Sequence, residues 1–196
     1  MRKRLFDLFF SVTGALLLTP VFFCIAVWIS LDSRGGIFYR QQRVGLNGRD
    51  FGLLKFRTMR TGSDKHGLLT IGGRDSRITR SGYFLRKYKL DELPQLLNVM
   101  KGDMSLVGPR PEVRKYVDLY TPEQLLVLSV RPGITDFASI DYSNENELLA
   151  GAENPEKMYV DEVMPAKLRL NLRYIREQGV LTDLKIICRT LLKIVS

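Results

Sequence analysis

Asp91 and Glu92 are adjacent carboxylates at a point where the sequence predicts the start of a helix. The cations Arg86, Lys87 and Lys89 come just before them, and the N-terminus of a helix itself attracts anions. Positive surroundings favour the ionised form of a carboxylate, which can then act as a nucleophile or bind a metal ion. Since neighbouring residues on a helix point about 100° apart, the two acids can do different jobs. Acidic residues at a helix start also serve as simple caps, so this pair needs support from other residues.

Arg110 lies between two prolines in the stretch Gly108-Pro109-Arg110-Pro111. The prolines restrict the backbone, so the guanidinium loses less freedom when it binds a partner. Arginine can contact two oxygens of a phosphate at once, which lysine cannot do. In isolation this stretch would be a solvent-exposed polyproline turn. Combined with the two acids and their cationic neighbours, it predicts chemistry on a phosphate ester.

The composition of the chain favours anionic partners and argues against two classes of site. The 196 residues carry a formal net charge of +9, which points to phosphorylated substrates, nucleic acid or the anionic surface of a bilayer. Cys24 and Cys188 both lie in apolar runs, and His66 is the only histidine. The sequence therefore predicts neither a disulfide or zinc site nor a histidine-based triad.

Residues Leu5 to Leu31 are almost all apolar and predict a membrane segment. As one helix they would extend about 40 Å, enough to cross a hydrocarbon core of about 30 Å. Pro20 removes a backbone donor, so we expect a break there, and the Thr19 hydroxyl is placed to bond a freed backbone group. Basic residues lie on both sides of the segment, which favours a re-entrant helix with both ends in the cytoplasm. A spanning helix with a proline kink is the alternative.

The chain is thus expected to contain a re-entrant membrane helix, residues 1–33, and a cytoplasmic catalytic domain, residues 34–196. The domain is predicted to be mainly helical and α+β, with a short strand region. Residues 37–59 suggest extended pieces with a turn at residues 45–48, so that Lys55 and Arg57 share one face of a strand. Residues 61–78 are polar and Gly-rich and predict a loop. Helices are expected at residues 81–88 and 92–100, the second one stopped by Gly102.

The C-terminal segment predicts an amphipathic helix. An apolar stripe at three–four spacing contains Leu181, Leu184, Cys188, Leu191 and Val195, and a separate basic line contains Lys185, Arg189 and Lys193. The apolar stripe can pack on the domain core, while the basic line suits an interfacial helix on anionic lipid. The sequence leaves both arrangements open.

Five motifs occur together in this chain: Thr19-Pro20 within the apolar segment, Lys55–Met59, Leu90–Gln95 with Asn98, Lys101–Pro111, and Arg131–Thr135. Together they resemble the monotopic phosphoglycosyl transferases, the bacterial sugar transferase family. The resemblance covers most of the chain, and the motif at residues 101–111 is highly specific. The chain is similar to the small, single-domain members, which consist of little beyond the catalytic core.

The resemblance implies transfer of a sugar-1-phosphate from a UDP-sugar to a polyprenol phosphate, usually undecaprenyl phosphate, at the start of glycoconjugate assembly. It also implies release of UMP, a requirement for Mg²⁺, and a covalent phosphosugar intermediate on the aspartate of an Asp-Glu dyad. In this sequence Asp91 would be the nucleophile and a magnesium contact, and Glu92 its partner. Thr19-Pro20 would correspond to the break in the family's re-entrant helix, which holds such enzymes on the cytoplasmic face of the bacterial inner membrane.

A diphosphate donor needs its charge neutralised by cations before a carboxylate can approach it. The candidates for binding substrate phosphate are Lys55, Arg57, Arg86, Arg110 and Arg131. The segment Asp136–Asn146 departs from the pattern of the family, which leaves the donor sugar open.

The rival interpretation is a non-catalytic, membrane-anchored basic module that binds anionic lipid or nucleic acid. Such a module would carry clustered basic residues with interleaved aromatics. Here the cations are distributed along the chain and several lie beside carboxylates. The sequence therefore favours the enzyme, and no nucleic-acid partner is expected.

Overall fold

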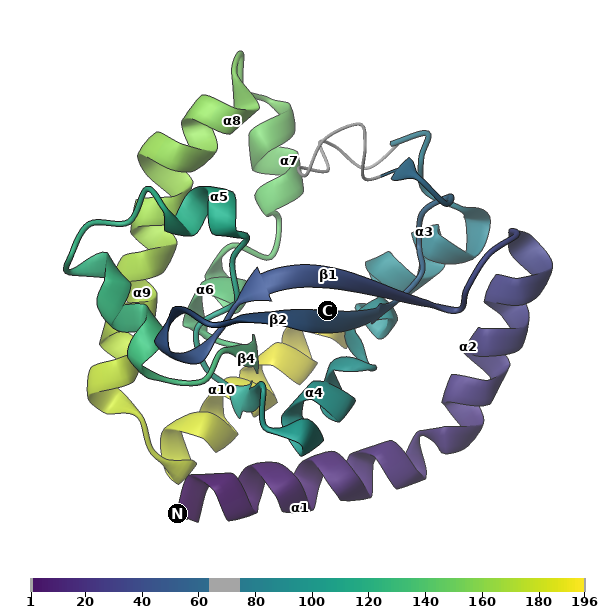
Figure 1. Ribbon diagram of the computed structural model, residues 1–196, viewed down its shortest axis with the longest axis horizontal. Helices are drawn as coiled ribbons and strands as arrows, with labels where there is room; N and C mark the ends of the chain where they lie inside the picture. The colour runs from purple at the N-terminus through teal and green to yellow at the C-terminus, as the bar shows by residue number, and fades with distance from the viewer. Residues whose placement is uncertain (1, 64–74, 196) are drawn as a thin grey trace.

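The structure, a computed structural model, describes residues 2–63 and 75–195 (Figure 1). It is mainly helical with a small sheet region, as the sequence predicts. Strands β1 (Phe38–Val44) and β2 (Asp50–Phe56) form an antiparallel hairpin, and β3 (Ser105–Val107) pairs in parallel with β4 (Gly133–Thr135). The hairpin confirms the strand region expected at residues 37–59. The predicted loop at residues 61–78 falls largely on residues 64–74, which lie outside the described residues together with His66.

The N-terminal apolar segment folds as two helices, α1 (Arg2–Leu17) and α2 (Thr19–Asp32), with a bend of 59° between them (Figure 1). Pro20 lies in the first turn of α2, where its missing N–H breaks no helical bond. The Thr19 hydroxyl donates to the carbonyl of Ala15 at 2.9 Å, so the break and this contact agree with the prediction. Among the described residues no single helix is long and apolar enough to cross a bilayer, whereas the bent pair meets that test by length and composition.

One face of this helix pair packs on the domain and the other is exposed. Ile25 and Ile29 of α2 are buried against Phe56 of β2 and Leu85. The outward face leaves large apolar side chains exposed, among them Leu5, Phe9, Leu16, Leu17, Phe23 and Leu31.

The two predicted acids lie between two helices. The helix α3 (Arg80–Lys87) leads into a 3₁₀ turn, η3 (Leu90–Glu92), and then into α4 (Gln95–Lys101). The prediction that the second helix includes Glu92 was wrong, because Pro94 has no N–H with which to continue an α-helix from η3. Gly102, with a φ of 99°, ends α4 as expected.

The remaining helices make up the side of the domain opposite α2 (Figure 1). A buried cluster that includes Tyr116, Tyr159, Val163 and Leu168 holds most of them together. In chain order they are α5 (Arg114–Val117), η4 (Gln124–Ser129), α6 (Phe137–Asp141), α7 (Glu145–Ala150), α8 (Pro155–Met158), the π-helical turn η5 (Tyr159–Val163), α9 (Met164–Glu177) and α10 (Val180–Val195).

The helix α10 packs on the domain through a line of residues that the periodicity did not single out. Ile186 is fully buried, and Ile187 packs on the same apolar cluster. The predicted stripe instead faces away from the core, with Leu181, Leu184, Cys188 and Leu191 all exposed. That stripe therefore does not pack on the domain core.

Candidate active site

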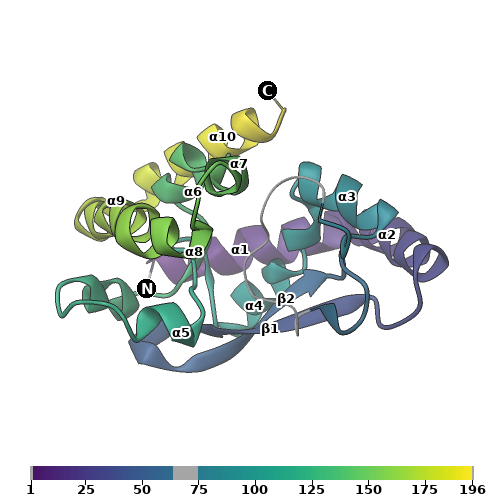
Figure 2. The ribbon, with the colours of Figure 1, turned by 90° about the horizontal axis from the view of Figure 1, so that it is seen from above.

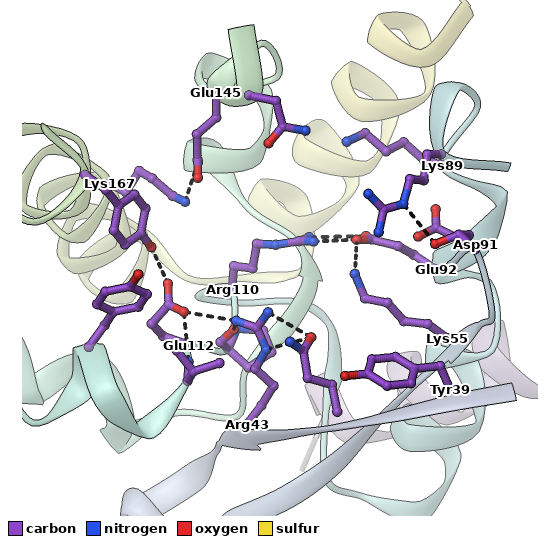
Figure 3. Close-up of a pocket in the computed structure, with 18 of the residues that line it drawn as sticks. Tyr39, Arg43, Lys55, Lys89, Asp91, Glu92, Arg110, Glu112, Glu145 and Lys167 are labelled. Atoms are coloured by element: carbon purple, nitrogen blue, oxygen red, sulfur yellow. Dashed lines mark hydrogen bonds and ion pairs between the residues drawn. The ribbon is translucent and has the colours of Figure 1, made fainter. Parts of the chain in front are cut away.

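A cavity of about 330 Å³ lies between the β1–β2 hairpin, the η3 turn and the helices on the opposite side of the domain (Figure 3). Ligand pockets are typically about 300–1000 Å³ in volume. Its lining includes most of the residues predicted for the site, namely Asp91, Glu92, Lys55, Arg57, Arg86 and Arg110. The fold thus brings together side chains that are far apart in the sequence.

The backbone around Lys89 directs the two acids into this cavity. Lys89 has a φ of 55°, a left-handed conformation that ends α3 and turns the chain into η3. Leu90 and Leu93 pack onto the apolar cluster against α2 and anchor the turn. Asp91 and Glu92, which lie between these two leucines, line the cavity, as does Lys89 (Figure 3).

Glu92 is fully engaged by two cations. Lys55 donates to its Oε1 at 2.9 Å, and Arg110 donates to both carboxylate oxygens, with Nη1 at 3.2 Å from Oε2 (Figure 3). Burial acts to raise the pKa of the Glu92 carboxyl, but Arg110 and Lys55 outweigh it and hold that pKa well below its usual range. Burial lowers the pKa of Lys55, and Glu92 opposes that change. Glu92 is therefore ionised, and it holds both cations in place at the cavity.

Asp91 has a different environment, although it is the next residue. It is 6% exposed, and its carboxylate forms no hydrogen bond or ion pair with any residue that the structure describes. Burial raises the pKa of Asp91 more than Lys55 and Arg86 lower it. The nearby cations favour the ionised carboxylate, as expected, but loss of hydration has the larger effect on its pKa. Its oxygens are available to a ligand.

The other predicted phosphate-binding residues are placed differently from one another. Arg86 donates from Nε to the Thr58 hydroxyl at 2.8 Å and lines the cavity. Arg57 also lines the cavity, but its guanidinium bonds the carbonyls of Ser33, at 2.8 Å, and Arg34, just beyond the end of α2. Arg131 does not line the cavity.

The side chain of Arg131 reaches the end of α4 instead. Its Nε donates to the carbonyl of Gly102 at 2.8 Å. This contact joins the segment just before β4 to the C-terminal end of α4, the helix that follows Asp91 and Glu92. The structure therefore does not bring Arg131 together with the other candidates.

Sequence reasoning missed a second set of residues in the same cavity. Arg43 donates to Glu112 at 3.0 Å, and Lys167 donates to Glu145 at 2.6 Å (Figure 3). Asn171 also lines the cavity, from within α9. Lys167 and Asn171 lie in α9, whose helical pattern carries no signal that separates them from ordinary surface positions. Arg43, Glu112 and Glu145 come from other segments, so the set was found only through the fold.

The arrangement suits a phosphorylated ligand. Several cations line one end of the cavity, together with the buried carboxylate of Asp91, which has no hydrogen-bond or ion-pair partner within residues 2–63 and 75–195. Among the described residues no group of three or more acidic, histidine or cysteine side chains could hold a metal ion by itself. Mg²⁺ commonly binds through one or two carboxylates together with substrate phosphates and water. Asp91 fits that pattern as a single protein ligand.

Known proteins resemble this chain along its whole length. The model of the family described as "Bacterial sugar transferase" matches residues 1–196. The "Uncharacterized sugar transferase EpsL" of Bacillus subtilis (strain 168) is 41% identical over 197 residues, which cover 98% of this chain and 86% of that protein.

Two further relatives carry names that state a reaction. The UDP-glucose:undecaprenyl-phosphate glucose-1-phosphate transferase of Caulobacter vibrioides is 37% identical over 193 residues, which cover 97% of this chain and 68% of that protein. The UDP-N-acetylgalactosamine-undecaprenyl-phosphate N-acetylgalactosaminephosphotransferase of Aeromonas hydrophila is 43% identical over 141 residues, which cover 70% of this chain and 33% of that protein.

Proposed function

Because this chain belongs to the bacterial sugar transferase family, we propose that it transfers a sugar-1-phosphate from a UDP-sugar to a polyprenol phosphate and releases UMP. The names of the relatives support this reaction, since they describe transfer from UDP-glucose or UDP-N-acetylgalactosamine to undecaprenyl phosphate. Undecaprenyl phosphate is accordingly the proposed acceptor.

The observation that carries the proposal is the contrast between the two acids of the dyad. Glu92 is held by Lys55 and Arg110, so its oxygens are occupied. Asp91 has no such partner among the described residues, although it lies in the same cationic cavity. Of the two carboxylates, Asp91 is therefore the one free to attack phosphorus, and Glu92 is a positioning residue for the cations.

The reaction then has two steps. A carboxylate oxygen of Asp91 attacks the β-phosphorus of the UDP-sugar, forms an O–P bond and displaces UMP, so that the sugar phosphate stays on the enzyme. A phosphate oxygen of the polyprenol phosphate next attacks the same phosphorus and frees Asp91. Arg110, Arg86 and Lys55 neutralise the charge of the diphosphate as the carboxylate approaches.

Mg²⁺ fits this scheme as the cofactor. Asp91 would hold the ion, whose positive charge would lower the repulsion between the carboxylate and the donor diphosphate. The residues of the chain do the rest: Asp91 supplies the nucleophile, and Glu92 keeps Lys55 and Arg110 directed into the cavity.

The N-terminal helices support a membrane-bound enzyme. The bend at Thr19-Pro20 and the exposed apolar face of α1 and α2 suit a re-entrant segment, residues 1–33, that enters and leaves by one surface. Residues 34–196 would then lie on the cytoplasmic face of the bacterial inner membrane. The exposed leucine stripe of α10 suits a helix that rests on the same surface.

The test is to incubate the purified protein in nanodiscs with Mg²⁺ and each of several UDP-sugars, including UDP-glucose and UDP-N-acetylgalactosamine. Without acceptor, we expect at most one UMP per enzyme and a matching mass gain on the peptide that contains Asp91. Undecaprenyl phosphate should allow repeated turnover. Asp91→Asn should show neither result, whereas the control Asp118→Asn, at an exposed position outside the cavity, should behave as wild type.

A mass gain on another residue would refute Asp91 as the nucleophile. UMP release only when donor and acceptor are both present, with no labelled peptide, would refute the covalent intermediate. Absence of UMP with every donor, combined with binding to anionic vesicles, would favour the non-catalytic module instead.

A further inference from the structure

The cavity extends beyond the dyad into a region of different chemistry. Arg110 lies between Glu92 on one side and Glu112 and Lys167 on the other (Figure 3). The charged groups on the far side are already paired with each other, Arg43 with Glu112 and Lys167 with Glu145. Each of those pairs is neutral, whereas Lys55 and Arg110 share the single negative charge of Glu92 and so leave net positive charge for a diphosphate. The far side therefore suits an uncharged part of the donor.

Asn171 is the exceptional residue of this far side. Its side chain is 4% exposed and lines the cavity from α9, and its Oδ1 has no hydrogen-bond partner among the residues that the structure describes. Buried amide groups are almost always hydrogen-bonded, because an unpaired polar atom that has left water costs free energy. An amide left unpaired at the wall of a cavity is explained if a ligand supplies its partner.

The surroundings indicate what kind of ligand that is. We call Asn171 and its apolar neighbours Leu149, Tyr159 and Leu168 the amide end of the cavity. A side-chain amide presents an acceptor and a donor side by side in one plane. The edge of uracil presents the matching pattern, an N3–H donor beside a carbonyl acceptor, on a flat ring that suits apolar and aromatic walls.

We propose that Asn171 is a specificity-determining residue that reads the uracil of the donor at the amide end. This inference rests on the proposed function, since it assigns one part of a UDP-sugar to one part of the cavity. The Asn171 amide accepts from N3–H and donates to the adjacent carbonyl, while the diphosphate reaches past Arg110 towards Asp91. Sugar hydroxyls could also bond an amide, so the experiment must separate the base from the sugar.

The experiment compares wild type with Asn171→Leu, a substitution of similar volume. Binding of UMP and of N3-methyl-UMP, which lacks the N3–H donor, is measured by calorimetry on the full chain in nanodiscs. Wild type should bind UMP more tightly than the methylated nucleotide. Asn171→Leu should weaken UMP binding by about 10- to 100-fold, the usual effect of losing hydrogen bonds to a buried polar group, and should no longer distinguish the two nucleotides.

A matched variant separates this role from a structural one. Asn98 is equally buried but fully bonded, since it accepts from the N–H of Leu54 and donates to the carbonyl of Gly52, both at 2.9 Å. Asn98→Leu should lower the melting temperature of the free protein. Asn171→Leu should leave it unchanged or raise it, because the substitution removes an unpaired buried amide.

Three results would overturn the assignment. The first is equal binding of UMP and N3-methyl-UMP by wild type, or no binding of either. The second is wild-type UMP affinity in Asn171→Leu. The third is a higher KM for the UDP-sugar in Asn171→Leu without a matching loss of UMP affinity, which would place the sugar at the amide end. Selective UMP binding that depends on Asn171, in an enzyme without turnover, would support the amide end and refute the proposed function.

Discussion

Replacing Glu92 with Gln tests whether one buried carboxylate holds two cations at the active site. The side chains of Glu92, Lys55 and Arg110 are 12%, 17% and 34% exposed. Breaking a buried ion pair by removing one partner costs about 3–5 kcal/mol, and partial exposure of Arg110 reduces that cost through solvent screening. We therefore expect Glu92→Gln to lose about 2–3 kcal/mol of stability, a drop in Tm of roughly 4–12 °C for a domain of this size.

The same substitution should also change the pH dependence of turnover. Burial lowers the pKa of Lys55, and Glu92 counteracts this by favouring the ammonium form. Without Glu92 the pKa of Lys55 falls further, so Lys55 loses its charge at a lower pH. The alkaline limb of the kcat/KM profile should accordingly move to lower pH in Glu92→Gln, and kcat/KM should fall because Arg110 is no longer held.

Thermal unfolding in nanodiscs and UMP release across pH are the two measurements. The control is Glu156→Gln, which removes the partner of Lys115 in a pair whose side chains are 51% and 55% exposed. That variant should change stability by less than about 1 kcal/mol. If Glu92→Gln melted like this control and kept the wild-type alkaline limb, Glu92 would not be the residue that holds Lys55 and Arg110.

Three further predictions concern Asp91, the metal and the membrane segment. Burial raises the pKa of Asp91 in the folded protein above its ordinary 3.8. Folding stability is therefore lost as the pH rises from 3.8 through the pKa of the folded state. Asp91→Asn should accordingly raise Tm at about pH 7.5, and this gain should vanish towards about pH 4. An unchanged Tm at both pH values would contradict this reading of its burial. Chelation by EDTA should abolish UMP release and added Mg²⁺ should restore it; activity that survives chelation would refute the magnesium proposal. Replacing Thr19 and Pro20 with Ala should favour a straight spanning helix, so a cysteine label at the N-terminus should change sides in vesicles, and unchanged sidedness would show that the break does not control topology.

Features that depend on neighbouring residues could be predicted from the sequence. Pro20 breaks the apolar segment because its ring and missing N–H act on the adjacent turn, and Gly102 ends α4 because it adopts a φ that other residues avoid. The alternation at residues 37–59 predicted the hairpin, and most of the predicted site residues line one cavity. The main local error was the start of α4. The helix was predicted to begin at Glu92, but it begins at Gln95, after Pro94.

Features that depend on distant residues were decided only by the tertiary structure. The sequence indicates that Asp91 and Glu92 can differ in role, but not how. In the structure Arg110 and Lys55 bond Glu92, and Asp91 is buried with no hydrogen-bond or ion-pair partner in the described part of the chain. Arg131 resembles the other arginine candidates in sequence, yet its side chain bonds Gly102 outside the cavity. Asn171 carried no distinguishing pattern, and the spacing that revealed the apolar stripe of α10 did not show that the stripe faces away from the core. Composition and motifs thus determine which chemistry the chain can support, whereas hydrogen-bond partners and burial, which determine the role of each group, depend on contacts between segments far apart in the chain.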